Sequence, residues 1–302
     1  MSARYLTLTV PPELAGLEVN TLLRRTLGLS GTVLRRVKWL EDGITLDGAR
    51  VNVRVRGSEG QTLSVRLTLP APASGVVPAP GPLDIVYEDP DLIVLNKAPG
   101  VPVHPGHGHF DDTIGNFLMD YYKKSGDESD FHPVHRLDRG TSGLLVIAKH
   151  PHAQEKLKNQ LHTGGFRRVY LAVCDGAPPA PAGVIDAPIG PVDGSLMARG
   201  VQPGGRPART HYRVVRALGP RSLVELELET GRTHQIRVHM AHIGCPLTGD
   251  FLYGREDRAL IPRPALHSAG LELDHPITGE RLRLAAPLPA DLARLIPEEN
   301  II

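Results

Sequence analysis

The sequence has few of the features that mark secreted or membrane-bound proteins. Only two of its 302 residues are cysteines, Cys174 and Cys245, which is typical of a reducing compartment. No apolar run reaches the roughly 18–20 residues that a membrane-spanning helix needs. The start, MSARYLTLTVPPE, lacks the charged beginning and long apolar core of a signal peptide. We therefore expect a cytoplasmic protein that makes no contact with a membrane.

Motifs for cofactors, metals and nucleophilic serines are also missing. There is no glycine-rich phosphate loop, no HExxH and no paired CxxC. The segment RGTSGLL is not a nucleophile elbow, since Gly143 directly follows Ser142. Two groups of histidines could in principle bind a metal, but histidines are also common in loops and at helix ends. The groups are His104, His107 and His109, and His234, His239 and His242. We expect neither a metal nor a cofactor.

Charge is balanced overall but unevenly distributed. The net charge is +1, whereas residues 1–70 contain ten basic and six acidic residues and so carry +4. Five of these basic residues lie close together, namely Arg24, Arg25, Arg35, Arg36 and Lys38. A basic module on a near-neutral body is typical of polyanion binding. A solvated helix face accounts equally well for the same charges.

A linker divides the chain into two predicted domains. Residues 70–82, PAPASGVVPAPGP, are rich in proline, alanine and glycine and show no periodicity. Before them, residues 1–69 suggest two short basic helices, an Asp-Gly turn between strands, and a final alternating strand. This module resembles an S4-type RNA-binding domain, although Val19-Asn20-Thr21 stands where that domain usually has Arg-Leu-Asp. Residues 83–302 form the predicted catalytic domain.

The body reads as a sheet with scattered helices. Short strands are predicted at LDIVYED, DLIVLNKA, GLLVIAK, VYLAVCD, THYRVVRAL and SLVELELET. Helices are predicted at DDTIGNFLMDYYKK, PHAQEKLKNQLHT, HQIRVHMAHIG and DLARLI. Strands in groups, without a repeating strand–helix alternation, favour an α+β fold with a mixed, mainly antiparallel sheet.

Three stretches suggest one chemical site. Asp138 lies between Arg136 and Arg139, immediately before an apolar run. A nearby cation favours the ionised form of a carboxylate, which suits a nucleophile or base better than a general acid. Tyr170 offers a flat ring that can pack on a nucleobase, and Arg237 can pair with a carboxylate. Each of these residues, considered alone, could equally have a structural role, such as Tyr170 in a strand core or Arg237 on a helix surface.

These stretches carry a resemblance to a known family. The ordered segments HRLDRGTSGLLVIAK, RRVYLAV and LETGRTHQIRVHMAHIGCPLTGD resemble the three main motifs of the RluA-type RNA pseudouridine synthases. Weaker likenesses surround them, so that the resemblance covers about residues 83–290. One departure is Phe251, where the family usually has proline.

The resemblance implies a pseudouridine synthase fold with a central cleft, and isomerisation of uridine to pseudouridine without a cofactor. It implies catalytic roles for Asp138, Tyr170 and Arg237, and we expect substrate binding by His135, Arg136, Arg232 and Gln235. The implied partner is RNA, most closely 23S ribosomal RNA, bound by a monomer. Transfer RNA as the target, an inactive RNA-binding protein and an unrelated Asp-dependent hydrolase remain alternatives.

Overall fold

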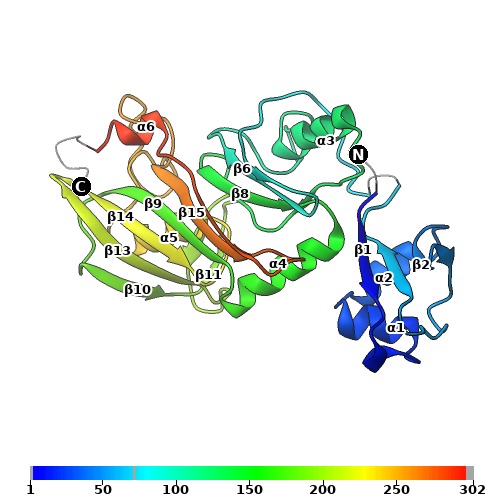
Figure 1. Ribbon diagram of the computed structural model, residues 1–302. Coiled ribbons are helices and arrows are strands. Elements are labelled where there is room, and N and C mark those ends of the chain that lie inside the picture. The colour runs from blue at the N-terminus through cyan, green and yellow to red at the C-terminus, as the bar shows by residue number, and fades with distance from the viewer. Residues whose placement is uncertain (1–2, 71–72, 297–302) are drawn as a thin grey trace.

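The chain forms two main sheets, each with its own hydrophobic core (Figure 1). The structure is a computed structural model that describes residues 3–70 and 73–296. The smaller sheet belongs to the N-terminal module and is antiparallel throughout, in the order β1-β4-β2-β3. Its strands are β1 (Tyr5–Thr9), β2 (Ile44–Leu46), β3 (Ala49–Arg50) and β4 (Thr62–Arg66).

Two short helices cover this small sheet, as the sequence predicts. After a 3₁₀ turn, η1 (Pro12–Leu14), helix α1 (Val19–Thr21) continues as a π-helical turn, η2 (Leu22–Thr26), and α2 (Gly31–Val37) follows. The leucine and valine side chains of these helices are buried in the module core, whereas the basic ones are exposed, namely Arg24, Arg25, Arg35, Arg36 and Lys38. The cationic face is therefore open to solvent.

The larger sheet has ten strands and carries the body. Eight follow one path, β10-β13-β14-β9-β15-β8-β6-β5, while β16 pairs with β15 and β7 with β8. All pairs are antiparallel except β15 with β8, which confirms the predicted mixed, mainly antiparallel α+β fold. The strands are β5 (Ile85–Glu88), β6 (Leu92–Lys97), β7 (His132–Pro133), β8 (Ser142–Ala148), β9 (Arg167–Asp175), β10 (Ala182–Asp186), β13 (Arg209–Leu218), β14 (Arg221–Leu228), β15 (Leu266–Asp274) and β16 (Arg281–Ala285).

Four helices accompany this sheet, and each lies where the sequence predicts one. They are α3 (Ile114–Ser125), α4 (Pro151–Thr163), α5 (Gln235–His242) and α6 (Ala290–Ala293). Helix α4 begins at a proline, and the His150 side chain caps it by accepting a bond from the Ala153 amide. None of the described helices is long and apolar enough to cross a membrane.

Several strands are not apparent from the sequence. Residues 182–201 form β10 and a separate small hairpin of β11 (Ile189–Pro191) and β12 (Arg199–Val201), which lie in a glycine- and proline-rich stretch with little alternation. Strands β15 and β16 were likewise not predicted. Strand β15 joins the two halves of the large sheet, because it pairs with β9 on one side and β8 on the other.

Ion pairs and a docked segment connect the module to the body. Arg4 donates two hydrogen bonds to the buried carboxylate of Asp91, at 2.8 and 2.9 Å. Arg66 pairs with both Asp42 and Glu128. Residues 73–82 of the predicted linker lie against the body, where Asn116 donates to the Val77 carbonyl at 2.8 Å. Residues 71–72 of that linker lie outside the described residues.

Candidate active site

Asp138 lies in the loop between β7 and β8, and backbone contacts fix that loop. The Thr141 amide donates to the Asp138 carbonyl at 3.0 Å, which closes a tight turn. Two buried basic side chains hold the next two carbonyls: Lys97 donates to Arg139 at 3.2 Å and Arg263 to Gly140 at 3.0 Å. The loop is therefore set before any substrate binds, while the Asp138 side chain stays 28% exposed.

Arg237 faces Asp138 from α5, as the resemblance implies. Its Nη1 lies 3.8 Å from Oδ2 of Asp138. Its Nε and Nη2 are already occupied, each donating at 2.7 Å to the fully buried carboxylate of Asp250. Burial alone would lower the pKa of the Arg237 guanidinium, but its bond to Asp250 and the charges of Asp250 and Asp138 outweigh burial and raise that pKa. The remaining amino group of the Arg237 guanidinium, Nη1, therefore faces Asp138 while Asp250 holds the rest of the guanidinium in place.

The sequence neighbours of Asp138 do not pair with it. Arg136 is exposed, and its guanidinium has no ion-pair or hydrogen-bond partner among residues 3–70 and 73–296. Arg139 instead lies 3.1 Å from Nε2 of His109. The cation that faces Asp138 comes from a distant helix, so Arg136 is free to contact a substrate.

Tyr170 forms a buried wall beside Asp138. It lies on β9, is 3% exposed and belongs to the main core of the body. Burial raises the pKa of its hydroxyl above the ordinary value, so the phenol is protonated at neutral pH. A rigid aromatic side chain at the wall of a hollow can pack against a flat ligand.

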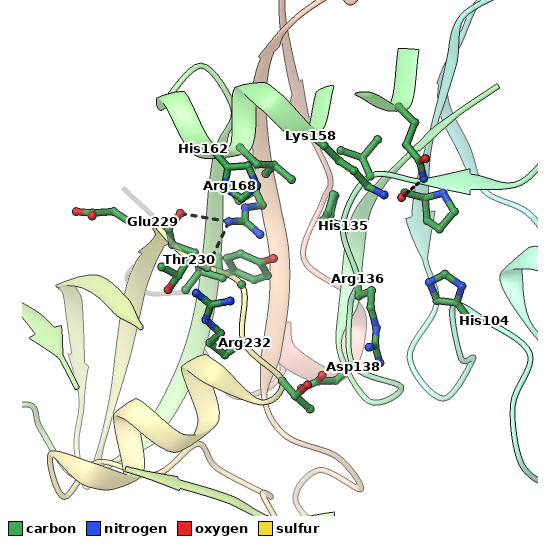
Figure 2. Close-up of a pocket in the computed structure, with 18 residues that line it drawn as sticks. His104, His135, Arg136, Asp138, Lys158, His162, Arg168, Glu229, Thr230 and Arg232 are labelled. Atoms are coloured by element: carbon green, nitrogen blue, oxygen red, sulfur yellow. Dashed lines mark hydrogen bonds between the residues drawn. The ribbon is translucent and has the colours of Figure 1, made fainter. Parts of the chain in front are cut away.

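Asp138, Arg136 and Tyr170 line a hollow of about 520 Å³, which we call the catalytic hollow (Figure 2). Helix α4 contributes Lys158 and His162 to it, and the loop before α5 contributes Arg232. With Arg136 and Arg168, the basic residues outnumber the acidic ones, Asp138 and Glu229. The surplus of cations suits a polyanionic ligand.

The remaining predicted residues occupy different positions around the hollow. His135 lines it but is buried, accepts from the Val146 amide at 3.2 Å, and has its pKa lowered to about 3 by burial, so it is neutral. Gln235 is buried below the loop before α5 and accepts from the Arg232 amide at 2.9 Å. The Nε of Arg232 donates to the Pro207 carbonyl at 2.9 Å. Substrate contact by these three residues remains a prediction.

Four residues that shape the site were not predicted from the sequence. Asp250 orients Arg237, Tyr253 lies under the Arg237 guanidinium at 4.9 Å, and Lys97 and Arg263 hold the Asp138 loop. Lys97 and Asp250 do fall in stretches that resemble the family, LIVLNKAPGVPVHPG and LTGD. Nothing in the sequence around Lys97 and Asp250 indicates that Lys97 binds a carbonyl of the Asp138 loop or that Asp250 binds the Arg237 guanidinium.

The histidine runs do not converge on a metal site. His239 is buried and bonded to Thr210 and to the Ala187 carbonyl, and His109 contacts Asp112. Among the described residues, the cluster with ligand atoms close enough for a metal is Asp89, Asp91 and His275. Arg4 and His150 already bond that same Asp91, so its carboxylate is satisfied by protein groups.

Comparison of the fold with solved structures defines its class. Human RNA Pseudouridylate Synthase Domain Containing 4 superposes with a TM-score of 0.58 and 26% identity, covering 70% of this chain and 91% of that chain. Human RNA Pseudouridylate Synthase Domain Containing 1 gives the same TM-score and identity over 72% of this chain and 89% of that chain. The protein has the pseudouridine synthase fold, extended by a small N-terminal antiparallel sheet with helices.

Sequence comparisons define the family. A family model for RNA pseudouridylate synthases matches residues 91–242. The protein called Uncharacterized RNA pseudouridine synthase YjbO of Bacillus subtilis is 41% identical over 91% of this chain and 96% of its own length. Ribosomal large subunit pseudouridine synthase D of Nitrosomonas europaea is 39% identical over 96% of this chain and 86% of its own. The chain belongs to the RNA pseudouridylate synthase family and is an isomerase that acts on RNA.

Proposed function

We propose that this synthase modifies specific uridines of 23S ribosomal RNA, using Asp138 as the essential carboxylate. Relatives named ribosomal large subunit pseudouridine synthase D support the choice of RNA, at 39% identity in Nitrosomonas europaea and 45% in Escherichia coli. The observation that best supports the role of Asp138 is its ion pair with Arg237 at the edge of the catalytic hollow.

The first step is extrusion of the target nucleotide from its stack. Unstacking costs a few kcal/mol, which the enzyme must offset. Arg136 is placed to do so, because its exposed guanidinium has no bonded partner within the described ranges and lines the hollow beside Asp138 (Figure 2). A planar cation can stack on the bases that the uridine leaves behind.

The chemical step is an internal transfer. The bond between N1 and C1′ breaks, the uracil turns and C5 bonds to C1′; the C5 proton then leaves and N1 takes up a proton, so the product is an isomer of the substrate. Asp138 either attacks C1′ or stabilises charge while a proton leaves C2′, and both routes need its ionised form beside the sugar. Tyr170 packs on the base and restricts its motion, while Arg237 holds the carboxylate in place.

The N-terminal module would add sequence-independent contacts. We assign residues 1–69 to RNA binding because α2 and the preceding π-helical turn both carry exposed arginines. Lysine and arginine contacts to phosphates position a protein on RNA without reading sequence. Residues 83–302 would carry the chemistry.

An in-vitro reaction tests the proposal. Purified wild-type protein and Asp138→Asn are incubated separately with unmodified 23S transcript and with unmodified transfer RNAs, and pseudouridine is then mapped chemically. We expect conversion at defined sites in 23S RNA by the wild type, and none by Asp138→Asn at equal RNA binding. Conversion in transfer RNA alone would overturn the choice of target. Conversion by folded Asp138→Asn would overturn the role of Asp138, and release of free uracil would indicate a hydrolase.

A further inference from the structure

A second hollow adjoins the catalytic hollow at Asp138. Its volume is about 580 Å³, and it shares Asp138 with the catalytic hollow and also reaches Arg237. Its other walls are mostly apolar and include Pro99, Met197, Phe251, Leu252 and Pro264. The chemistry assigned to Asp138 and Arg237 does not use the apolar walls of the second hollow, so these walls are unexplained.

Phe251 is the aromatic surface of the second hollow. The side chain is 55% exposed although phenylalanine is usually buried, and it lies 5.8 Å from the Arg237 guanidinium. Met197, from the β11–β12 hairpin, adds a second exposed apolar side chain at 60%. Exposed apolar patches beside a reactive site commonly mark a binding surface.

The turn that carries Phe251 is fixed. Buried Asp250 accepts from the amides of Leu252 at 3.0 Å and Tyr253 at 3.2 Å. The Tyr253 hydroxyl in turn accepts from the Arg199 amide at 2.8 Å, which ties the β11–β12 hairpin to the same turn. The backbone segments that carry Phe251 and Met197 are therefore joined to each other, so they need little ordering when a ligand binds.

The charge at the rim limits what the occupant can be. Arg139 lines the second hollow and is exposed at its surface. The catalytic hollow, which adjoins the second hollow at Asp138, adds further cations, Arg136 among them. A ligand that is flat and apolar at one end and anionic at the other matches this arrangement, and a nucleotide has that form.

We propose that the second hollow holds an unpaired nucleobase that neighbours the target uridine in the same RNA strand, stacked on Phe251. The backbone between the two nucleotides then passes Asp138, and its phosphate faces Arg139. This inference rests on the proposed base extrusion at Asp138. It assigns Phe251 to recognition of the RNA flanking the target.

Steady-state kinetics test the stacking role, with total RNA from cells lacking this protein as the substrate pool. The variants are Phe251→Ala, Phe251→Trp and, as a control, Phe110→Ala, since Phe110 is 70% exposed outside both hollows. Base stacking on an aromatic side chain predicts a 5- to 150-fold rise in KM for Phe251→Ala, as roughly 1–3 kcal/mol corresponds to about that factor. Phe251→Trp should restore KM, and Phe110→Ala should leave it unchanged. A fall in kcat with unchanged KM would overturn the proposal, because Phe251 would then act only through Arg237.

Cross-linking supplies a second readout that does not need turnover. A photoreactive phenylalanine analogue is placed at position 251 or, in the control, at position 110, in the otherwise complete chain. We expect position 251 to cross-link within two nucleotides of the modified uridine. Cross-links only to distant RNA, only to protein, or none at all would overturn the stacking role. If RNA cross-links form but no uridine is converted in any pool, the proposed function fails instead.

Discussion

At the scale of single residues, the position of the Arg237 side chain depends mainly on its pairing with Asp250. The guanidinium is buried, and two of its donors go to Asp250, which has no exposed surface. Asp250→Ala leaves this cation without its main partner, and removing one member of a buried pair typically costs about 3–5 kcal/mol. We expect urea denaturation to show a loss of stability of that order, and kcat to fall because Arg237 no longer holds its position beside Asp138.

A surface pair gives the matched control for Asp250→Ala. Glu256 and Arg258 form an ion pair with side chains 48% and 79% exposed. Glu256→Gln should change the free energy of unfolding by less than about 1 kcal/mol, because exposed pairs contribute little. If Asp250→Ala is no more costly than this control, Asp250 does not support Arg237 in the way described.

At the scale of elements, the site depends on the parallel contact between β8 and β15. Gly143 lies in this contact with φ +103°, and a Cβ there would lie 2.2 Å from the Ser268 carbonyl oxygen. Gly143→Ala should therefore push β8 from β15 and cost about 3–5 kcal/mol, combining backbone strain with overpacking. Thermal or urea unfolding measures this loss, and activity should fall with it because the Asp138 loop leads directly into β8.

A second glycine with positive φ but open surroundings separates strain from steric overlap. Gly279 has φ +75°, and a Cβ added there would have no atom within 4 Å. Gly279→Ala should cost only about 1 kcal/mol, from backbone strain alone. Equal losses for the two substitutions would contradict the close approach of β8 to β15.

The local sequence pattern predicted most of the helices and strands but not how they pack and pair with one another. Helix α4 follows from its proline start and its apolar spacing, and β14 from strict alternation. Strand β15 was missed although it connects both halves of the sheet. Asp138, Tyr170 and Arg237 could be selected from motif resemblance, and the structure places Arg237 3.8 Å from Asp138, while their catalytic roles stay a prediction. The roles of Asp250 and Lys97 could not be predicted, because each role is a contact with a segment that is distant in the sequence.

At the scale of the whole molecule, the N-terminal module lies at one end of the molecule and the edge strand β10 at the other (Figure 1). Replacing Arg24, Arg25, Arg35 and Arg36 with glutamine should weaken RNA binding and flatten its salt dependence. Each phosphate contact contributes about 0.7–0.9 to the slope of log K against log salt, so losing four contacts lowers the magnitude of the slope by up to roughly 3.6. Binding titrations with 23S transcript at several salt concentrations measure this change.

Two arginines on the body serve as the control for the module. Arg213→Gln with Arg216→Gln alters β13, which lies far from the module in the large sheet (Figure 1). That double variant should keep the wild-type slope. An unchanged slope for the module variant as well would refute its role in RNA binding.

The most direct test of the central claim is pseudouridine mapping in cells. Ribosomal and transfer RNA from cells lacking this protein are compared with RNA from the same cells carrying the wild-type gene or the Asp138→Asn gene. The account predicts that defined sites in 23S RNA lose pseudouridine without the protein and regain it with the wild type alone. Restoration by Asp138→Asn, or the same modified sites in all three strains, would contradict it.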